Sequence, residues 1–400
     1  MQDKLDPDTS LEEKMLFEDD DNINDDEYTS IPKEIRRLKT QMHDWPVEVL
    51  VKKIEDKDII LRPQYQRDFV WERSRCSKLI ESILLNVPLP PIYLAEEEDG
   101  LLSVIDGLQR LRTFHEFFAD KFRLIKLRGE GLSDLNGCTF SDLVQKAPKA
   151  KRILRSGNIR TITIGKDSDP EIKYDIFERL NSGSQKLNDQ EIRNCIYHGK
   201  LNNLVMGTYN TEKEDYSKDG LRHNQHLQEI MNLRKPHKRY LDAEVILRIL
   251  AVIDLNGSVK TKYKSSMKLL INHYMEENRD PEEDEINRLR EVFNSTIEKV
   301  YTVFGKSSFR RYKGDQIEKS LNRSIMDCVC ATFVKHDKGT LLAHKEQILQ
   351  LMDRMLNNNQ SQPQHNGQTF LDSVTKWTSN KSVLEARLVI WDQCLTEILG

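Results

Sequence analysis

Short apolar runs alternate with amphipathic helical patterns between residues 31 and 206. The apolar runs predict strands at 59–61, 92–95, 101–106, 122–127 and 159–164. Apolar residues three and four positions apart predict helices at 72–86, 140–154, 169–180 and from residue 187 onward. One or two helices are expected within residues 31–51, with Pro46 at a first helical position. Interleaved strands and helices predict a mixed α+β domain over residues 31–206.

The second half of the chain shows helical spacing throughout. Beyond Lys238, apolar residues predict helices at 242–255, 262–277, 283–304, 320–334, 340–357 and 381–399. Residues 207–237 are polar with weak periodicity and predict a linker. We therefore expect an all-α C-terminal domain over residues 238–400.

Charge is spread unevenly along the chain. Residues 1–28 hold twelve Asp or Glu and two Lys, whereas the whole chain carries a net charge of only −4. Residues 1–30 are therefore expected to form an acidic, disordered tail before a mildly basic body. Such a tail either keeps the protein in solution or competes with a polyanion for the basic surface.

Composition narrows the class of protein. The chain contains no apolar run of membrane-spanning length and no basic N-terminal leader, so a cytoplasmic protein without a membrane partner is expected. The six cysteines are scattered, which predicts reduced and mostly buried thiols.

One turn in the first domain carries the residue types that bind anions. In the segment Val104–Thr113, an apolar strand leads into Asp106 and Gly107, and a helical pattern follows immediately. The first turn of a helix offers free backbone N–H groups to an anion, and Arg110 can add two more donors. Asp106 can either cap the helix or hold a metal ion beside a phosphate. Taken alone, an ordinary strand–helix joint explains the same residues.

Two further polar clusters lie in the same predicted domain. Gln66 and Arg67 follow a short strand, and Glu178 and Asn181 stand at a predicted helix end. Asp106 and Glu178 are the carboxylates best placed to share Mg²⁺ with a nucleotide. Positioning and charge neutralisation are what phosphoryl chemistry requires. The alternative is that each cluster caps a helix or faces water.

Several known signatures are missing from the sequence. The chain has no GxxxxGK[ST] loop, no G-x-S-x-G turn and no HNH-like histidine arrangement. A nucleotide site here must therefore be of another type.

A basic loop in the C-terminal half is a candidate DNA contact. The stretch 309–313 places Arg310, Arg311 and Lys313 beside two aromatic residues and between two glycines. Arginine and lysine bind phosphates, and aromatic rings can stack on bases. A solvated loop with its rings folded onto the core is the alternative.

Four segments together resemble one family. PQYQRDFVW, ESILLNVPLPPIYL, VIDGLQRLRT and FERLNSGSQKLNDQEIRN follow one another as do the blocks of the GmrSD N-terminal domain family. The resemblance covers roughly residues 45–206. The segments KRYLDAEVILRILA and LNRSIMDCVCATF are similar to the helical C-terminal half of stand-alone members.

The resemblance implies a ParB/sulfiredoxin-like fold and a nucleotide site. It implies that Asp106, Gln109 and Arg110 act in catalysis and that Asp106 and Glu178 hold Mg²⁺. The nucleotide would be lined by Gln66, Arg67, Asp106, Gly107, Gln109, Arg110 and Asn181. The family's usual turn reads DGQQR, whereas this chain has Leu108 in the middle. Leu108 either faces the core and leaves the motif working, or it weakens hydrolysis.

The family further implies nucleoside triphosphate binding and hydrolysis coupled to DNA cleavage in restriction or phage defence. We expect an NTPase that acts on or senses DNA, with Mg²⁺ and a nucleoside triphosphate as cofactors. A partner nuclease subunit or a homo-oligomer would complete the system, because no HNH domain is recognisable here. Two alternatives are a non-catalytic DNA-binding or regulatory module with a vestigial nucleotide site, and a DNA nickase.

Overall fold

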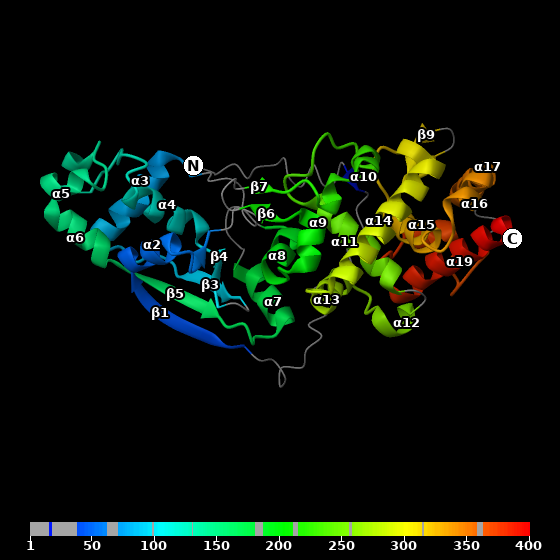
Figure 1. Cartoon of the computed structure of the whole chain (residues 1–400), viewed down its shortest axis with the longest axis horizontal. Coiled ribbons are helices and arrows are strands. Elements are labelled where there is room, and N and C mark those ends of the chain that lie inside the picture. The colour runs from blue at the N-terminus through cyan, green and yellow to red at the C-terminus, as the bar shows by residue number, and fades with distance from the viewer. Residues whose placement is uncertain are drawn as a thin grey trace. The chain divides into compact units, whose positions relative to one another are not determined.

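The protein is described by a computed structural model (Figure 1) that covers residues 16–17, 38–61, 71–97, 100–129, 131–180, 187–210, 215–255, 258–313, 316–357 and 363–400. The chain divides into two compact units. Residues 31–196 form the first, here called the mixed unit, and residues 197–400 with residues 1–30 form the second, here called the helical unit. The boundary therefore falls at residue 196, whereas the sequence predicted residue 206.

A five-stranded mixed sheet organises the mixed unit (Figure 1). Its strands, in spatial order, are β1 (Thr40–Pro46), β5 (Asn158–Ile164), β3 (Ile92–Glu96), β4 (Leu102–Asp106) and β2 (Ile59–Ile60). β1 runs antiparallel to β5, β5 parallel to β3, β3 antiparallel to β4, and β4 parallel to β2. Strand β4 ends at Asp106, which faces Tyr93 of β3 across the ladder.

Helices pack against this sheet and around a single apolar core. The helices around this core are α2 (Val47–Glu55), α3 (Arg73–Leu84), α4 (Leu108–Phe118), α5 (Asp142–Lys146) and α6 (Pro148–Ser156), with a 3-10 turn η3 (Ser133–Leu135). Helices α7 (Pro170–Leu180) and α8 (Asp189–Ile196) follow β5 and pack on each other. Leu50 of α2, Ile80 of α3 and Leu111 of α4 share the core with Leu94 and Ile159 of the sheet. The predicted α+β class is confirmed.

Three local predictions in this unit were wrong. Residues 40–46 form an edge strand, and Pro46 stands before α2 as its N-cap. Residues 122–127 form no strand, because Leu124 exchanges hydrogen bonds with the Gly137–Cys138 turn. The helix predicted at 140–154 is two helices, since Pro148 begins a new one.

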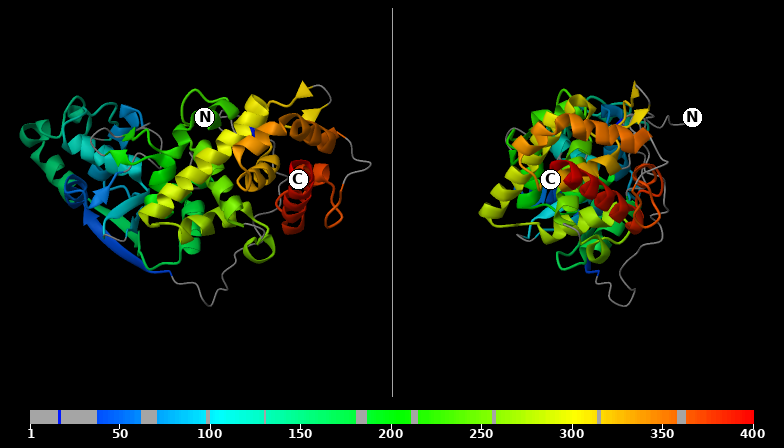
Figure 2. Two further views of the ribbon diagram at one scale, coloured as in Figure 1. Left: turned by 45° about the vertical axis from the view of Figure 1, so that its right-hand side comes forward. Right: turned by 90° about the vertical axis from the view of Figure 1, so that its right-hand side faces the viewer.

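The helical unit is built from long helices (Figure 2). The longer ones are α11 (Leu241–Leu255), α13 (Met267–Glu277), α14 (Glu283–Phe304), α15 (Arg323–Phe333), α17 (Lys345–Asn357) and α19 (Lys381–Leu399). Short elements connect them: α9 (Lys200–Met206), β6 (Tyr209–Asn210), β7 (Asp215–Tyr216), η4 (Leu221–His223), α10 (Gln225–Ile230), α12 (Val259–Lys262), η5 (Gly305–Ser307), β8 (Tyr312–Lys313), β9 (Gln316–Ile317), α16 (Lys338–Ala343) and α18 (Phe370–Thr375). The predicted all-α character is confirmed apart from these two short strand pairs.

The segment predicted as a linker, residues 207–237, is part of this unit. It contains η4 and α10, and it buries Leu221, Leu227 and Ile230. Leu227, Ile230 and Met231 do have helical spacing, but this group is short and stands among polar residues, so the sequence analysis missed it. Only Leu16 and Phe17 of the acidic tail are described: Leu16 accepts a hydrogen bond from Leu321 N, and the ring of buried Phe17 lies under the Arg323 guanidinium.

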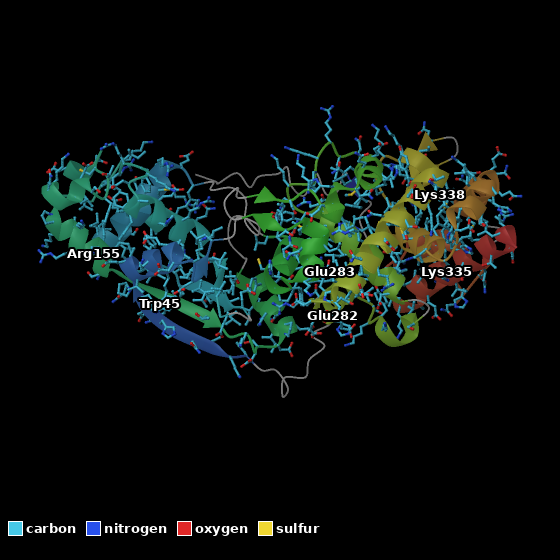
Figure 3. The ribbon with its side chains drawn as sticks, in the orientation of Figure 1. Trp45, Arg155, Glu282, Glu283, Lys335 and Lys338 are labelled. Atoms are coloured by element: carbon cyan, nitrogen blue, oxygen red, sulfur yellow. The ribbon has the colours of Figure 1, made fainter. Side chains whose placement is uncertain are left out.

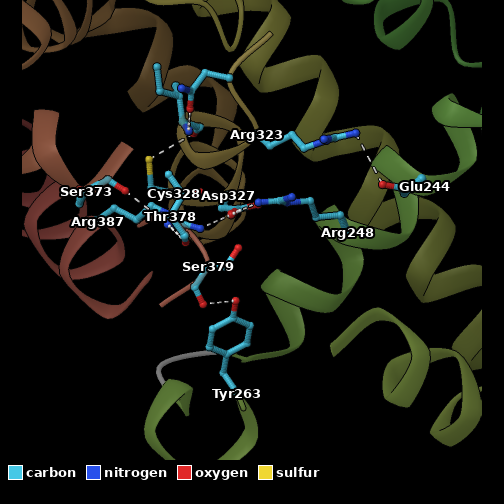
Figure 4. A network of polar contacts seen from close by, with 12 residues as sticks. Glu244, Arg248, Tyr263, Arg323, Asp327, Cys328, Ser373, Thr378, Ser379 and Arg387 are labelled. Atoms are coloured by element: carbon cyan, nitrogen blue, oxygen red, sulfur yellow. Dashed lines mark hydrogen bonds and ion pairs between the residues drawn. The ribbon is translucent and has the colours of Figure 1, made fainter. Parts of the chain in front are cut away.

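An arginine–aspartate–arginine cluster lies in the centre of the helical unit (Figure 4). Asp327 of α15 accepts hydrogen bonds from Arg248 of α11 at 2.8 and 2.9 Å and from Arg387 of α19 at 2.7 Å. The Asp327 and Arg387 side chains are fully buried. Three helices far apart in sequence are therefore joined through one carboxylate.

Two further predictions can be checked across the described residues. All six cysteines are free and buried, as expected. Within the described residues, every helix is too short or too polar to cross a membrane.

Candidate functional site

The turn between β4 and α4 has the geometry that the sequence predicted for an anion site. Gly107 has φ +102°, in the left-handed region that favours glycine. A Cβ atom at this position would lie 2.9 Å from Ile92 Cγ1, so a larger residue would collide with the sheet. Gly107 is also the N-cap of α4, and no side chain caps the helix. The first N–H groups of α4 and the positive end of its dipole are therefore directed at the space beyond the turn.

Leu108 faces the core. Its side chain is only 3% exposed and packs in the same apolar cluster as Leu111, Phe114 and Ile92. The middle position of the turn therefore points away from any ligand beyond the helix end. Of the two possibilities that the sequence left open, the structure supports the one in which Leu108 belongs to the core.

Arg110 is committed to contacts within its own unit. Its Nη2 donates to Asp106 Oδ2 at 2.8 Å and to the carbonyl oxygen of Pro91 at 3.0 Å, and its Nη1 donates to the carbonyl oxygen of Pro90. Burial lowers the pKa of Arg110, while the Asp106 carboxylate opposes that shift. The guanidinium thus holds the Asp106 carboxylate and ties the chain before β3 to α4. To bind a phosphate, Arg110 would have to give up these bonds or use the remaining N–H donors of its guanidinium group.

Asp106 keeps an open side toward solvent. Its side chain is 50% exposed although one carboxylate oxygen, Oδ2, is held by Arg110. Gln109, three residues after Asp106 in the chain, has a buried side-chain oxygen without a hydrogen-bond partner among the described residues. Thr113 donates from its hydroxyl to the Gln109 carbonyl oxygen at 2.7 Å, one helical turn further on. The turn therefore offers one fixed carboxylate and one amide beside the open helix end.

The other predicted nucleotide and metal residues lie elsewhere or are not described. Gln66, Arg67 and Asn181 lie outside the described residues. Glu178 is exposed on α7, a helix that packs on α8. Among the described ranges, no group of three or more His, Cys, Asp or Glu residues could hold a metal ion. The structure thus brings together Asp106, Gly107, Gln109 and Arg110, and the part of the others in this site stays a prediction.

A buried polar cluster on α8 was missed by the sequence analysis. Gln190, Arg193 and Asn194 are all buried, and Gln190 Nε2 donates to Asn194 Oδ1 at 2.9 Å. Arg193 donates to Gln190 Oε1 at 3.3 Å. Asn188 and Glu191 form a reciprocal capping box, with bonds of 2.8 and 2.7 Å. The Asn188-x-x-Glu191 spacing could have predicted the cap, but no periodicity predicts that polar residues of a helix face inward.

The predicted DNA loop uses its arginines internally. Arg310 donates to the carbonyl oxygens of Lys306 at 2.7 Å and Ile230 at 2.9 Å, and burial lowers its pKa. Arg311 pairs with Glu318, with a 3.1 Å bond from Nε to Oε2. The Lys313 side chain lies outside the description. The structure thus gives both arginines a role in holding the loop, and DNA contact by Arg310, Arg311 and Lys313 stays a prediction.

Comparison with known proteins gives one match. Residues 47–198 match the family model described as GmrSD restriction endonuclease, N-terminal domain. No curated protein and no solved structure matches the chain significantly. The matched range begins with α2 and ends just beyond α8, so it includes β2 to β5 and the turn at Gly107. The match indicates a role related to restriction or phage-defence nucleases and an interaction with DNA.

Proposed function

We propose that this protein binds a nucleoside triphosphate with Mg²⁺ and hydrolyses it while acting on DNA in restriction or phage defence. The proposal starts from the match of residues 47–198 to the GmrSD N-terminal domain. The observation that carries the proposal is the turn at Gly107. An uncapped helix N-terminus and the Asp106 carboxylate lie in the same turn. Backbone N–H groups at such an end bind phosphate oxygens, and a neighbouring carboxylate can hold the cation that accompanies them.

Asp106 fits the cation better than any other described residue of the turn. Mg²⁺ in nucleotide sites is commonly held by one or two carboxylates, with phosphate oxygens and water completing its shell. One Asp106 oxygen is held by Arg110, and the side chain remains half exposed. Bound there, the ion would supply charge neutralisation for the phosphates. Glu178 remains a proposed second ligand.

Arg110 acts in this proposal as a positioning residue. Its bonds to Asp106 and to the Pro90 and Pro91 carbonyl oxygens fix the carboxylate relative to the helix end. Gln109 has a buried side-chain oxygen without a hydrogen-bond partner among the described residues, and its amide is proposed to orient a phosphate or the attacking water. Gln66, Arg67 and Asn181 are proposed to line the nucleotide.

The test compares two aspartates that have similar surroundings. Asp106 pairs with Arg110 and is 50% exposed, whereas Asp44 pairs with Arg160 on the edge strand and is 49% exposed. We expect Asp106→Asn to weaken binding of the Mg²⁺–triphosphate complex by about tenfold or more, because a carboxylate ligand is lost. Asp44→Asn should bind like the wild type. Calorimetric titration measures both, and unchanged affinity in Asp106→Asn would refute the site.

A non-catalytic module is the second candidate. The observation that favours it is that Arg110 already binds Asp106 and the carbonyl oxygens of Pro90 and Pro91. Its positive charge is therefore less available to neutralise a triphosphate at this turn. Phosphate release should be measured with each of the four nucleoside triphosphates, with and without duplex DNA. Turnover in any condition supports the hydrolase, whereas binding without turnover supports the module.

A further inference from the structure

Positive charge in the mixed unit is concentrated in one segment. Residues 121–160 contain ten Lys or Arg and three Asp or Glu, although the whole chain carries a net charge of −4. Nine of these ten basic side chains are exposed, and Lys151 is half-buried. The segment includes α5 and α6, which lie at the end of the mixed unit opposite α7 and α8 (Figures 1 and 2).

The fold of this segment places its apolar residues inward and its cations outward. Along the irregular stretch that begins at Lys121, buried Phe122, Leu124 and Leu127 alternate with exposed basic residues. The stretch is tied to the turn before α5. Leu124 N donates to the Cys138 carbonyl oxygen, Gly137 N donates to the Leu124 carbonyl oxygen, and Arg123 pairs with Asp142. The cations of residues 121–128 are therefore tied to the turn that leads into α5, the helix directly before α6.

Helix α6 is divided into an apolar side and a basic side. At about 100° per residue, Ala150, Ile153 and Leu154 fall on one side, and Leu154 is 1% exposed in the core. Arg152 and Arg155 fall on the opposite side, and Lys149 lies at the edge of this side next to Ile153. Figure 3 labels Arg155 on this helix. Helix α6 has no acidic residue. A helix that presents only cations to solvent fits a partner with regularly spaced negative charges.

The cations of α6 differ in what they contact. Arg155 pairs with Glu48, and the Lys151 ammonium lies over the Phe140 ring. Lys149 and Arg152 are exposed, and their side chains make no hydrogen bond or ion pair within the described part of the chain. This distinguishes them from Arg310 and Arg311, whose guanidinium groups are held by their own loop.

We propose that the basic side of α6, which carries Lys149 and Arg152, is the surface that contacts the phosphate backbone of duplex DNA. The inference rests on the proposed role of the chain in acting on DNA. Lysine and arginine that neutralise phosphates release condensed counterions, so binding through this face depends strongly on salt and weakly on sequence. The exposed cations at residues 121–128 would extend the same contact.

The experiment uses the full-length chain and a fluorescently labelled duplex without nucleotide. Lys149→Ala/Arg152→Ala should weaken binding about tenfold at low salt and lower the slope of log Kd against log salt by about two. The matched control is Lys218→Ala/Lys264→Ala, which removes two exposed lysines from the helical unit. The control should bind within about twofold of the wild type. Far-UV circular dichroism and thermal unfolding confirm that both variants are folded.

The outcomes separate this inference from the function that it rests on. If the wild type binds duplex DNA and Lys149→Ala/Arg152→Ala binds equally well, the α6 surface is wrong while the DNA role stands. Equal losses in variant and control would show that affinity follows net charge alone, which also overturns the surface. A wild type that binds no duplex, or that binds anionic phosphatidylserine vesicles more tightly, refutes both. Phosphate release measures the nucleotide site independently.

Discussion

Replacing Leu108 by glutamine tests whether the middle residue of the turn belongs to the core or to the site. The substitution creates the DGQQR turn that is usual in the family. If Leu108 faced the nucleotide, the added amide would strengthen binding or hydrolysis. Because the side chain is 3% exposed and packs with Leu111 and Phe114, we expect the reverse.

The structure sets the size of the loss. Removing a fully buried leucine side chain from the core costs about 1.5–3 kcal/mol in lost burial. Placing an amide there without a hydrogen-bond partner adds about 1–3 kcal/mol. Leu108→Gln should therefore lower the free energy of unfolding of the mixed unit by roughly 2.5–6 kcal/mol, a loss large enough to unfold a marginal domain. Leu108→Met keeps the volume and should cost less than about 1.5 kcal/mol.

The assay is urea unfolding of the full-length chain without nucleotide, with hydrogen exchange of α4 identifying the unit that opens. The two units need not unfold together, so the unfolding transition in which α4 loses its protection is the one to compare between the variants and the wild type. Triphosphate binding is measured on the same samples. If Leu108→Gln unfolded at the wild-type midpoint and bound triphosphate more tightly, the side chain would lie in the site and the burial argument would be refuted.

Two further predictions concern other parts of the fold. Asp327→Asn leaves the buried Arg248 and Arg387 without their shared carboxylate (Figure 4). It should lower the free energy of unfolding in urea by about 3–5 kcal/mol. The control, Asp254→Asn, breaks only an exposed pair with Lys262 and should cost less than about 1 kcal/mol. Equal midpoints in the two variants would contradict the cluster's role. Burial lowers the pKa of His115 below its ordinary value of 6.5, so the unfolded chain takes up the proton first. The stability contributed by neutral His115 is complete above about pH 6.5 and is lost as pH falls through the folded pKa. In urea unfolding measured across this pH range, His115→Gln should make the free energy of unfolding depend less on pH. The same pH dependence in His115→Gln and the wild type would exclude His115 as its source.

Much of the mixed unit could be predicted from the sequence because its patterns are local. Alternating β-branched residues identified β5, and helical spacing identified α3 and α4. Gly107 was correctly placed between a strand and a helix, since a tight turn there requires a residue that tolerates positive φ. The prediction for residues 122–127 failed although Phe122, Leu124 and Leu127 are buried between exposed residues. The backbone of this segment bonds to the Gly137–Cys138 turn and to the side chains of Ser77 and Asn136, instead of to a strand.

The candidate site was predicted less completely, because the partners of polar side chains lie far away in sequence. The carbonyl oxygens that occupy Arg110 belong to Pro90 and Pro91, on the other side of a hairpin. Arg310 is held by Ile230, across 80 positions of the chain. The burial of Gln190, Arg193 and Asn194 on α8 follows only from the packing of the fold.

The sequence by itself determined most of the elements, the turn of the chain at Gly107, and the similarity of residues 47–198 to the GmrSD N-terminal domain. These properties depend on residue types a few positions apart. Only the tertiary structure decided that Leu108 faces the core, that Arg110 positions Asp106, and that α6 leaves Lys149 and Arg152 unpaired within the described residues. An arginine can bind a phosphate, a carboxylate or a carbonyl oxygen. Which of these it meets depends on the segments that packing brings beside it.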